Sequence, residues 1–427
     1  MKDQILVNKY LPIAILYFFF NGFLLPHSLL YTSLLSPFLL IWLYKYNSYK
    51  LYSQIGLFLL ILLPFAVVQF LNGVNSFYYF RSFLLLFTVF IFALSFIQYL
   101  KLSNSIRTIY KQLLIWNIPF VLLALFILTQ PGLVTRFWYA NEITVGIAGI
   151  RRLKMLTYEP SYYSFLFVPI ALYYYLKFVI LKVPNAKLVF VLVTLPLLLS
   201  LSFGVILGLT LALLFTFIYG MGNFFPGKNW PIYAFGACLL LLISGVIFLF
   251  LFPENVFVIR IANVLSGKDT SFKGRTFDSF YLGWQIARAK SVWFGCGLGQ
   301  VKEIGLPYFI SFYNNTSFTI EEIGIPNAVC DTLATFGILG VTLRLITEVY
   351  LFFSTKVLSN YYRFSLFAFI FIYQFTGSFI MNIAEYVIWI MAFSPGIFKE
   401  FEKTFFSGYK QNLSHSNQNQ KIQIQTS

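Results

Sequence analysis

Runs of apolar residues alternate with short polar connections along almost the whole chain. A helix needs about 20 mostly apolar residues to cross the hydrocarbon core of a bilayer. The pattern therefore predicts an all-α, polytopic transmembrane helical bundle of about twelve spans, forming one domain over residues 1–408. The predicted spans lie near Tyr10–Leu25, Ser28–Tyr44, Gln54–Leu71, Phe77–Leu100, Tyr110–Thr129, Ser161–Leu181, Lys187–Ser200, Phe203–Met221, Pro231–Phe252, Ala328–Phe353, Phe364–Phe379 and Tyr386–Phe398.

The distribution of lysine and arginine predicts the orientation, because short cytoplasmic loops carry an excess of both. One alternating set of connections holds Lys2, Lys9, Lys45, Lys50, Lys101, Arg107, Lys111, Lys182, Lys187, Lys228, Lys356 and Arg363. The other set is mostly short and uncharged. Both termini are therefore predicted to face the cytoplasm. The tail 409–427 is rich in Gln, Asn and Ser and is predicted to be disordered there.

Composition agrees with lipid as the main solvent of this protein. Of the 427 residues, 59% are hydrophobic and only 10% are charged, whereas soluble proteins keep about a quarter of their residues charged. The net charge of +16 would suggest nucleic acid as a partner of a soluble protein. Here the basic residues lie between apolar runs, so membrane orientation explains them and no nucleic acid is expected. The first run lacks a cleavage site and is predicted to be an uncleaved anchor.

Two segments predicted to be outer, periplasmic loops are longer than simple connectors. They cover 130–160 and 253–327, and their basic residues are Arg136, Arg151, Arg152, Lys154, Arg260, Lys268, Lys273, Arg275, Arg288, Lys290 and Lys302. Long loops are translocated largely regardless of charge, and loops of this length are usually functional or disordered. Trp284 and Trp293 argue against disorder. The stretch Thr276–Lys290 is typical of a short amphipathic helix at a membrane surface.

The first candidate motif runs from Arg152 to the Glu-Pro-Ser at 159–161, which opens a predicted span. Proline is favoured in the first turn of a helix, and an acid there suits the positive end of the helix dipole. This structural explanation covers Glu159 but not the basic cluster Arg151, Arg152 and Lys154. Anchoring to anionic headgroups is an alternative explanation of the cluster.

The second candidate is Lys273-Gly-Arg275, followed by Trp284. A guanidinium can grip a phosphate with two parallel hydrogen bonds, and glycine lets the backbone approach a ligand. The third, the glycine-rich stretch Phe294–Gly299, is better explained as a tight turn that returns the loop to the membrane than as a nucleotide site. The fourth is Pro326-Asn327, where Asn327 stands at a helix start as an N-cap. Gly337 and Gly340 follow it and suit close helix packing.

The order of these four elements resembles that of the O-antigen polymerase and O-antigen ligase superfamily of bacterial inner-membrane glycosyltransferases. The resemblance covers roughly Arg151 to Gly340, the number of spans and the place of the large outer loop. It implies a donor oligosaccharide on undecaprenyl pyrophosphate, within membrane lipid, and outer-loop arginines that hold the pyrophosphate. Arg152 and Arg275 match the two arginine positions. The resemblance implies no cofactor and no metal, and it leaves open a chain-length regulator protein as a further partner.

One departure from the family pattern favours the polymerase branch. Ligases carry a His-Asn at the end of the large loop, with the histidine as proposed base, and here Pro326 stands at that position. His27 and His415 lie elsewhere. The base is thus unidentified among Glu159, Glu142, Asp278, Glu321 and Glu322, and Glu159 ranks first.

The catalytic candidates are therefore Arg152, Arg275 and Glu159, with the arginines stabilising the departing pyrophosphate. The candidates for substrate binding are Arg151, Lys154, Arg81, Lys273, Arg288, Asn327, Trp284 and Tyr158. Arg81 lies near the outer end of a span, where function or snorkelling both explain a charge. Arg344 and Glu348 are four residues apart on one span and are predicted to pair.

Three other functions remain open from the sequence: a ligase, a flippase for lipid-linked glycans, and a structural protein of the envelope. A flippase is expected to carry ionisable groups through the membrane midplane, and no internal repeat of the kind many transporters show is visible. Convergence of Arg152 and Arg275 within about 10 Å over an outward cavity would favour the enzyme. Cys296 and Cys330 could form a disulfide only if the fold brings them together, and Cys238 lies in an apolar run.

Overall fold

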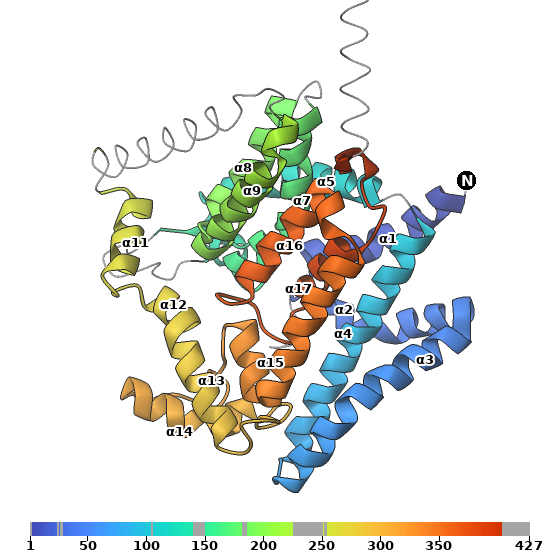
Figure 1. Ribbon diagram of the computed structural model, residues 1–427. Coiled ribbons are helices and arrows are strands. Elements are labelled where there is room, and N and C mark those ends of the chain that lie inside the picture. The colour runs from blue at the N-terminus through green and yellow to red at the C-terminus, as the bar shows by residue number, and fades with distance from the viewer. Residues whose placement is uncertain are drawn as a thin grey trace, which may run out of the picture.

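The computed structural model describes residues 2–23, 25, 29–103, 106–139, 150–181, 186–224, 251 and 254–403. Helices dominate this part of the chain, and six are long and apolar enough to cross a membrane (Figure 1). The sequence-based expectation of a helical membrane protein is thus confirmed, while the number of twelve spans stays a prediction. The predicted span Pro231–Phe252, Cys238, Glu142, both histidines and the tail 409–427 lie outside the described residues.

The long apolar helices are α3 (Ser36–Leu71), α4 (Ser76–Leu102), α5 (Ile106–Ile127), α7 (Pro160–Leu176), α9 (Phe203–Phe224) and α15 (Ala328–Ser354). Shorter helices are α1 (Lys2–Phe19), α2 (Tyr31–Leu34), α8 (Ala186–Ser200), α16 (Tyr361–Tyr373) and α17 (Ile383–Phe393). The remaining elements are α6 (Val134–Phe137), β1 (Trp138–Tyr139), β2 (Arg152–Leu153), η1 (Lys177–Leu181), α11 (Val256–Leu265), α12 (Thr270–Lys273), η2 (Gly274–Asp278), α13 (Ser279–Arg288), α14 (Val301–Tyr313), η3 (Val357–Ser359) and η4 (Lys399–Phe401).

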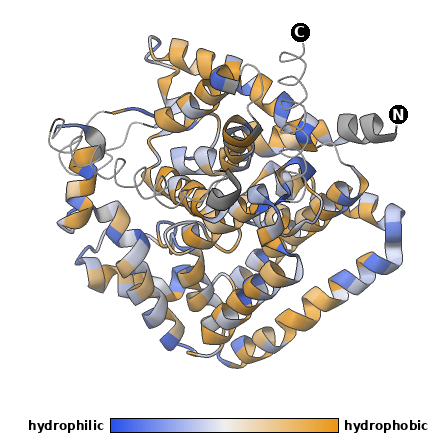
Figure 2. Cartoon of the chain, turned by 45° about the horizontal axis from the view of Figure 1, so that its top comes forward, coloured by the Kyte–Doolittle hydropathy of each residue, from blue (hydrophilic) through white to orange (hydrophobic). Residues whose placement is uncertain are grey.

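Helix α7 forms the centre of the molecule. It packs against α8, α9 and α16, and nearly all of its side chains are buried. Helix α3, in contrast, lies at the edge and exposes large apolar side chains such as Leu57, Leu60 and Leu63. In Figure 2 apolar residues cover the outward faces of the long helices, and the polar residues gather near the connections. Apolar outward faces are what a lipid environment requires.

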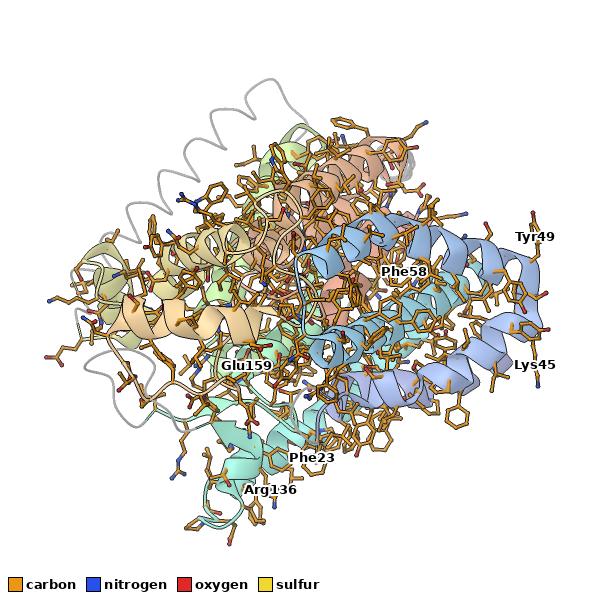
Figure 3. All side chains as sticks on the ribbon, turned by 90° about the horizontal axis from the view of Figure 1, so that it is seen from below. Phe23, Lys45, Tyr49, Phe58, Arg136 and Glu159 are labelled. Carbon is orange, nitrogen blue, oxygen red and sulfur yellow. The ribbon has the colours of Figure 1, made fainter. Side chains whose placement is uncertain are left out.

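Two predicted spans, Ser28–Tyr44 and Gln54–Leu71, share the single element α3. Its backbone breaks at Asn47, where φ is −160° and ψ is 89°. The Asn47 side chain accepts a hydrogen bond from the Lys50 amide at 3.0 Å, which satisfies a donor that the break frees. Figure 3 shows Lys45 and Tyr49 at the tip of this bend. The polar stretch around Asn47 therefore separates two helical segments at a sharp kink, in agreement with the two helices expected from the sequence.

Helix α15 also departs from the expected straight span, because it breaks at Gly337 (φ 68°). The glycine-rich turn 295–299 fills the break. The Cys296 amide donates to the Ala334 carbonyl at 2.8 Å, and the Ile338 amide donates to the Val292 carbonyl at 2.9 Å. Buried backbone groups need such partners. The turn therefore has the structural role expected for it, and Gly337 has the packing role.

Replacing Gly337 by alanine should destabilise the protein by about 1–3 kcal/mol or more. A Cβ at this position would lie 2.4 Å from the backbone of Trp293, and the positive φ disfavours any L side chain. The free energy of unfolding in detergent micelles measures the effect. The helical Gly56 is the control, because a Cβ added there would meet nothing within 4 Å. Equal losses for Gly337→Ala and Gly56→Ala would show that the break is not constrained.

A sheet of two very short strands accompanies the helices of this all-α fold. Strands β1 and β2 pair antiparallel, with Trp138 opposite Leu153 and Tyr139 opposite Arg152. The Trp138 indole donates to the Ala124 carbonyl at 2.8 Å and ties the sheet to α5. Strands of two residues give no alternating pattern in a sequence, which is why the pattern indicated only a loop here. The pairing fixes the position of Arg152.

The helix predicted over Thr276–Lys290 exists as the end of η2 followed by α13. Its apolar face, including Leu282 and Ile286, is buried and packs on α15 and α14. A Cβ on Gly283 would lie 3.0 Å from the Cys330 carbonyl, so α13 and α15 approach closely. We expected this face to meet a membrane surface, and the structure covers it with protein. The aromatic residues exposed on the other side of η2 and α13 are Phe277, Phe280, Tyr281 and Trp284.

Candidate functional site

Arg152 is held where β2 meets the end of α8. Its Nε atom donates to the carbonyl of Ser200, the last residue of α8, at 3.3 Å. Burial, followed by the nearby charges of Arg260 and Arg275, lowers the pKa of Arg152 to about 10, while Glu159 acts in the opposite direction. The guanidinium group therefore stays charged at neutral pH. These interactions show that Arg152 and Arg275, predicted from distant motifs, lie in one electrostatic group.

Arg275 stands on η2, a π-helical turn between α12 and α13. Such turns are rare and frequently occur at functional sites. Its carbonyl accepts a hydrogen bond from the Asn327 amide at 2.9 Å, which holds the turn against the start of α15. Its charge acts on Arg152, on Arg260 and on the Tyr373 hydroxyl at the end of α16. Four separate elements thus meet at this residue.

Arg260 belongs to the same group, although we did not select it from the sequence. Its Nε atom lies 3.0 Å from Oδ2 of Asp269, and the two side chains are 11% and 1% exposed. Its guanidinium stacks over the ring of Phe203 at 5.2 Å. Burial lowers the pKa of Arg260, Asp269 opposes this, and Arg275 adds to the lowering. In the sequence, only a basic residue nine positions before an acid could have indicated this pair.

Glu159 occupies the N-cap position of α7, and Pro160 is the first helical residue as predicted. The carboxylate does not cap the helix, however. It accepts a hydrogen bond from the Ser161 hydroxyl and acts electrostatically on Arg152, Tyr158 and Tyr373. Its side chain is therefore a counter-ion of the arginines.

The charges of this group do not balance. Arg152, Arg260 and Arg275 face two carboxylates, Glu159 and Asp269, and Asp269 is committed to Arg260. Like charges gathered in a partly buried place are unfavourable and mark functional sites. We call Arg152, Arg260 and Arg275 the arginine cluster. Its excess positive charge suits an anion, and three planar guanidinium groups suit a phosphate.

Asn327 is buried and fixes the backbone of Arg275, one member of the arginine cluster. It is 0% exposed. Its side-chain oxygen accepts the Cys330 amide at 3.0 Å, which confirms the predicted N-cap, and its nitrogen donates to the carbonyls of Arg275 and Phe375. We expected Asn327 to contact substrate. Its buried amide is bonded to the protein instead, so it positions Arg275.

The other candidates for substrate binding lie around the cluster. Tyr158 is exposed, stacks on Tyr162 with ring centroids 4.6 Å apart, and interacts electrostatically with Glu159 and Arg275. Lys154 is half-buried, and burial and Arg136 lower its pKa. Exposed side chains are those of Arg151, Lys273, Arg288, Arg81 and Trp284. The interactions that join the arginine cluster do not include Arg81, Arg288 or Trp284.

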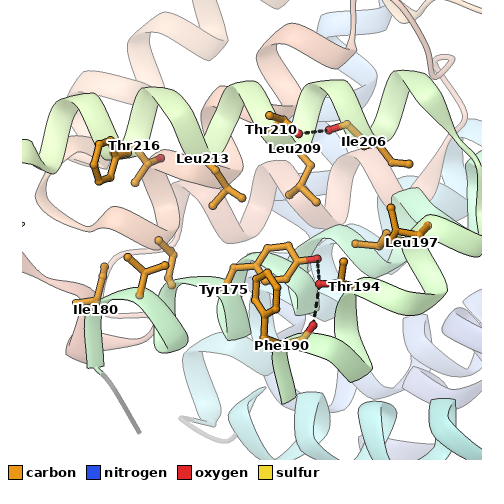
Figure 4. A pocket seen from close by; sticks show the side chains of 14 residues that line it. Tyr175, Ile180, Phe190, Thr194, Leu197, Ile206, Leu209, Thr210, Leu213 and Thr216 are labelled. Atoms are coloured by element: carbon orange, nitrogen blue, oxygen red, sulfur yellow. Dashed lines mark hydrogen bonds between the residues drawn. The ribbon is translucent and has the colours of Figure 1, made fainter. Parts of the chain in front are cut away.

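One cavity includes a residue of the arginine cluster in its lining, and a second is lined by α8 and α9, near the residues that contact the cluster. The first, of about 330 Å³ and here called the Arg275 cavity, lies between η2, α14 and the segment 324–326, and Tyr313 and Phe318 contribute to its wall. The other, also about 330 Å³, is the α7–α9 cavity, lined by apolar side chains of α7, η1, α8 and α9 (Figure 4). Its lining reaches Leu197 and Ile206, each three residues from a contact of the cluster, Ser200 or Phe203.

Within the described ranges there is neither a cluster of metal-binding side chains nor a disulfide bond. No three His, Cys, Asp or Glu side chains gather there in a way that could hold a metal ion. Cys296 and Cys330 are both buried and free, although they share one hydrophobic cluster with Leu282 and Ile286. The fold thus brings the two cysteines into the same region without bonding them.

Comparison with known proteins adds no family to this picture. No protein-family model matches the chain, and no curated protein matches it. The resemblance to the O-antigen polymerase and ligase superfamily therefore stays a prediction from the motifs.

Proposed function

We propose that this protein is an O-antigen or polysaccharide polymerase of the bacterial inner membrane. It transfers a glycan from a lipid pyrophosphate to a sugar hydroxyl of another lipid-linked repeat unit. The observation that carries the proposal is the mutual electrostatic interaction of the partly buried Arg152, Arg260 and Arg275, which together face only the carboxylates of Glu159 and Asp269. In this proposal both termini face the cytoplasm and the arginine cluster opens to the outer side.

The arginine cluster supplies what the chemistry needs. When the donor's anomeric carbon loses the pyrophosphate, negative charge grows on the leaving group, and fixed cations placed there lower the barrier. Hydrogen bonds to charged groups contribute about 1.5–3 kcal/mol each. Two or three arginines therefore supply several kcal/mol, on the order of a thousandfold in rate. Glu159 balances the arginines before the donor binds.

The α7–α9 cavity suits the lipid chain of the same donor. Its polar side chains already bond within the protein: the Tyr175 and Thr194 hydroxyls lie 3.0 Å apart, and the Thr210 hydroxyl donates to the Ile206 carbonyl at 2.9 Å. Figure 4 shows these bonds at the cavity wall. The remaining lining is apolar and fits an isoprenoid chain. Helices α8 and α9 line this cavity, and their residues Ser200 and Phe203 contact Arg152 and Arg260. A chain in the cavity would therefore direct its diphosphate toward the arginine cluster.

A flippase is the second candidate, and one observation favours it. Arg344, Glu348 and Glu385 form a buried ionic network between α15 and α17, and ionisable groups inside a membrane domain often serve transport. The partners in this network satisfy one another, however, as a structural network requires. That network joins one arginine to two carboxylates and so carries a negative excess, whereas the arginine cluster carries the positive excess that an anionic donor needs, which favours the polymerase.

Complementation of a polymerase-deficient strain tests the proposed function. The wild-type chain should restore a ladder of glycan lengths on the cell surface, because polymerisation adds repeat units one after another. A strain that lacks its flippase instead serves as the matched comparison. Rescue of the flippase strain without a ladder in the polymerase strain would refute the polymerase and support transport.

A further inference from the structure

A buried acid stands directly behind the wall of the Arg275 cavity. Asp278 belongs to the same π-helical turn as Arg275 and is only 4% exposed. Its Oδ2 atom accepts a hydrogen bond from the Tyr313 hydroxyl at 2.9 Å, and Tyr313 lines the cavity. A carboxylate so far out of water needs such a donor. Asp278 and Tyr313 therefore form a ready hydrogen-bonded pair that begins at the cavity wall.

The Tyr313 hydroxyl also lies close to the turn that carries Arg275. A Cβ built on Gly274 would be 4.0 Å from that hydroxyl oxygen. Burial, and then the hydrogen bond and charge of Asp278, raise the pKa of Tyr313, so the phenol keeps its proton at neutral pH and donates it to Asp278. A hydroxyl group in the cavity can donate a hydrogen bond to the lone pairs of the same phenol oxygen.

The cavity wall has the mixture of groups that holds a sugar. Phe309, Phe318 and Tyr313 offer aromatic faces, and the hydroxyls of Ser271 and Ser279 belong to residues of the opposite wall. Pro326 also lines this cavity and has no group that takes a proton. Glu159 lies among the arginines, where it accepts a hydrogen bond from Ser161 and faces Arg152. Among these groups, the pair of Tyr313 and Asp278 is the one that can take a proton from the cavity.

We propose that the Arg275 cavity binds the accepting sugar and that Tyr313 and Asp278 together receive the proton of its hydroxyl. This inference rests on the proposed polymerase function and adds the acceptor site and the base. The sugar oxygen forms a bond to the donor's anomeric carbon, and the bond from that carbon to the diphosphate breaks with its electron pair. The sugar proton passes to the Tyr313 oxygen while the Tyr313 proton passes to Asp278, so Tyr313 ends neutral and Asp278 protonated.

Arg275 links the two halves of this reaction. It lines the acceptor cavity and belongs to the arginine cluster that takes the diphosphate. A reaction between two bound lipid-linked molecules needs the nucleophile and the leaving group on opposite sides of one carbon. Placing the acceptor on one side of Arg275 and the diphosphate on the other meets that need.

The test uses the purified full-length protein in proteoliposomes with a synthetic lipid-linked repeat unit. Tyr313→Phe and Asp278→Asn should lower kcat for transfer by about 100-fold, the usual contribution of a general base. The KM for the donor should stay unchanged, because the arginine cluster is intact. Asp278→Glu should recover part of the rate. Tyr281→Phe, which removes a hydroxyl from an exposed tyrosine of α13, is the matched control and should keep the wild-type rate.

The outcomes separate this inference from the proposed function. Wild-type kcat in both Tyr313→Phe and Asp278→Asn, with normal transfer, would overturn the acceptor site and leave the polymerase standing. No donor cleavage by the wild-type protein would overturn both. A fall in kcat that is accompanied by an equally large rise in the donor KM would show that Tyr313 and Asp278 only support the fold around Arg275. If Asp278→Asn fails to accumulate, Tyr313→Phe decides alone, since it removes one hydroxyl oxygen and keeps the aromatic ring.

Discussion

Replacing Arg275 by alanine should collapse the glycan ladder of a complemented strain to a single added unit while the protein still inserts. Arg275 belongs to the arginine cluster and also lines the Arg275 cavity. Its loss therefore removes positive charge that would stabilise the departing diphosphate. One lost hydrogen bond to a charged group of about 1.5–3 kcal/mol corresponds to about 10- to 100-fold in rate. Arg152→Ala should act in the same way. The two measurements are the length of the glycan ladder on a gel and the amount of the variant protein in the membrane.

Two further variants sharpen this result. Arg275→Lys should also be weak, because an ammonium group cannot form the two parallel hydrogen bonds of a guanidinium. Arg136→Ala is the matched control, since Arg136 is an exposed arginine on α6 of the same predicted outer segment as Arg152. A normal ladder from Arg152→Ala or Arg275→Ala would reject the role assigned to that residue.

Replacing Arg344 by alanine should destabilise the protein by about 3–5 kcal/mol, as breaking a buried ion pair does. The Arg344 Nε atom lies 3.1 Å from Glu348 and 2.8 Å from the Gln374 side-chain oxygen, and another of its nitrogens binds Glu385. Without Arg344, two buried carboxylates would lack their cation. Denaturation in detergent micelles measures the loss. A change below about 1 kcal/mol would show that water reaches the network.

The features of the fold that depend only on residues within one helix were predictable from the sequence. The apolar runs on α4, α5 and α9, the N-cap at Asn327 and the pairing of Arg344 with Glu348 are local patterns, and all appear as expected. The break at Gly337 was not predictable. It exists because a turn some forty residues earlier in the chain supplies the hydrogen bonds, and no local pattern carries that information.

The candidate site divides along the same line. Arg152 and Arg275 were chosen because each stands in a short motif, and the fold brings both into one electrostatic group. Arg260 has no motif, and its ion pair with Asp269 depends on how α11 turns into α12. Trp284 and Arg288 were chosen because they lie in a predicted amphipathic helix. That helix buries Leu282 and Ile286, however, and leaves Trp284 and Arg288 exposed. Which face a helix buries depends on its partner, here α15.

Binding of a diphosphate to the purified full-length protein tests the central claim most directly. Titration calorimetry with a short-chain isoprenoid diphosphate should give saturable binding at one site, weakened about 10-fold or more in each of Arg152→Ala, Arg260→Ala and Arg275→Ala. Arg136→Ala should bind as the wild type does. Equal affinity in all of these proteins, or no binding at all, would show that the three guanidinium groups do not form a diphosphate site.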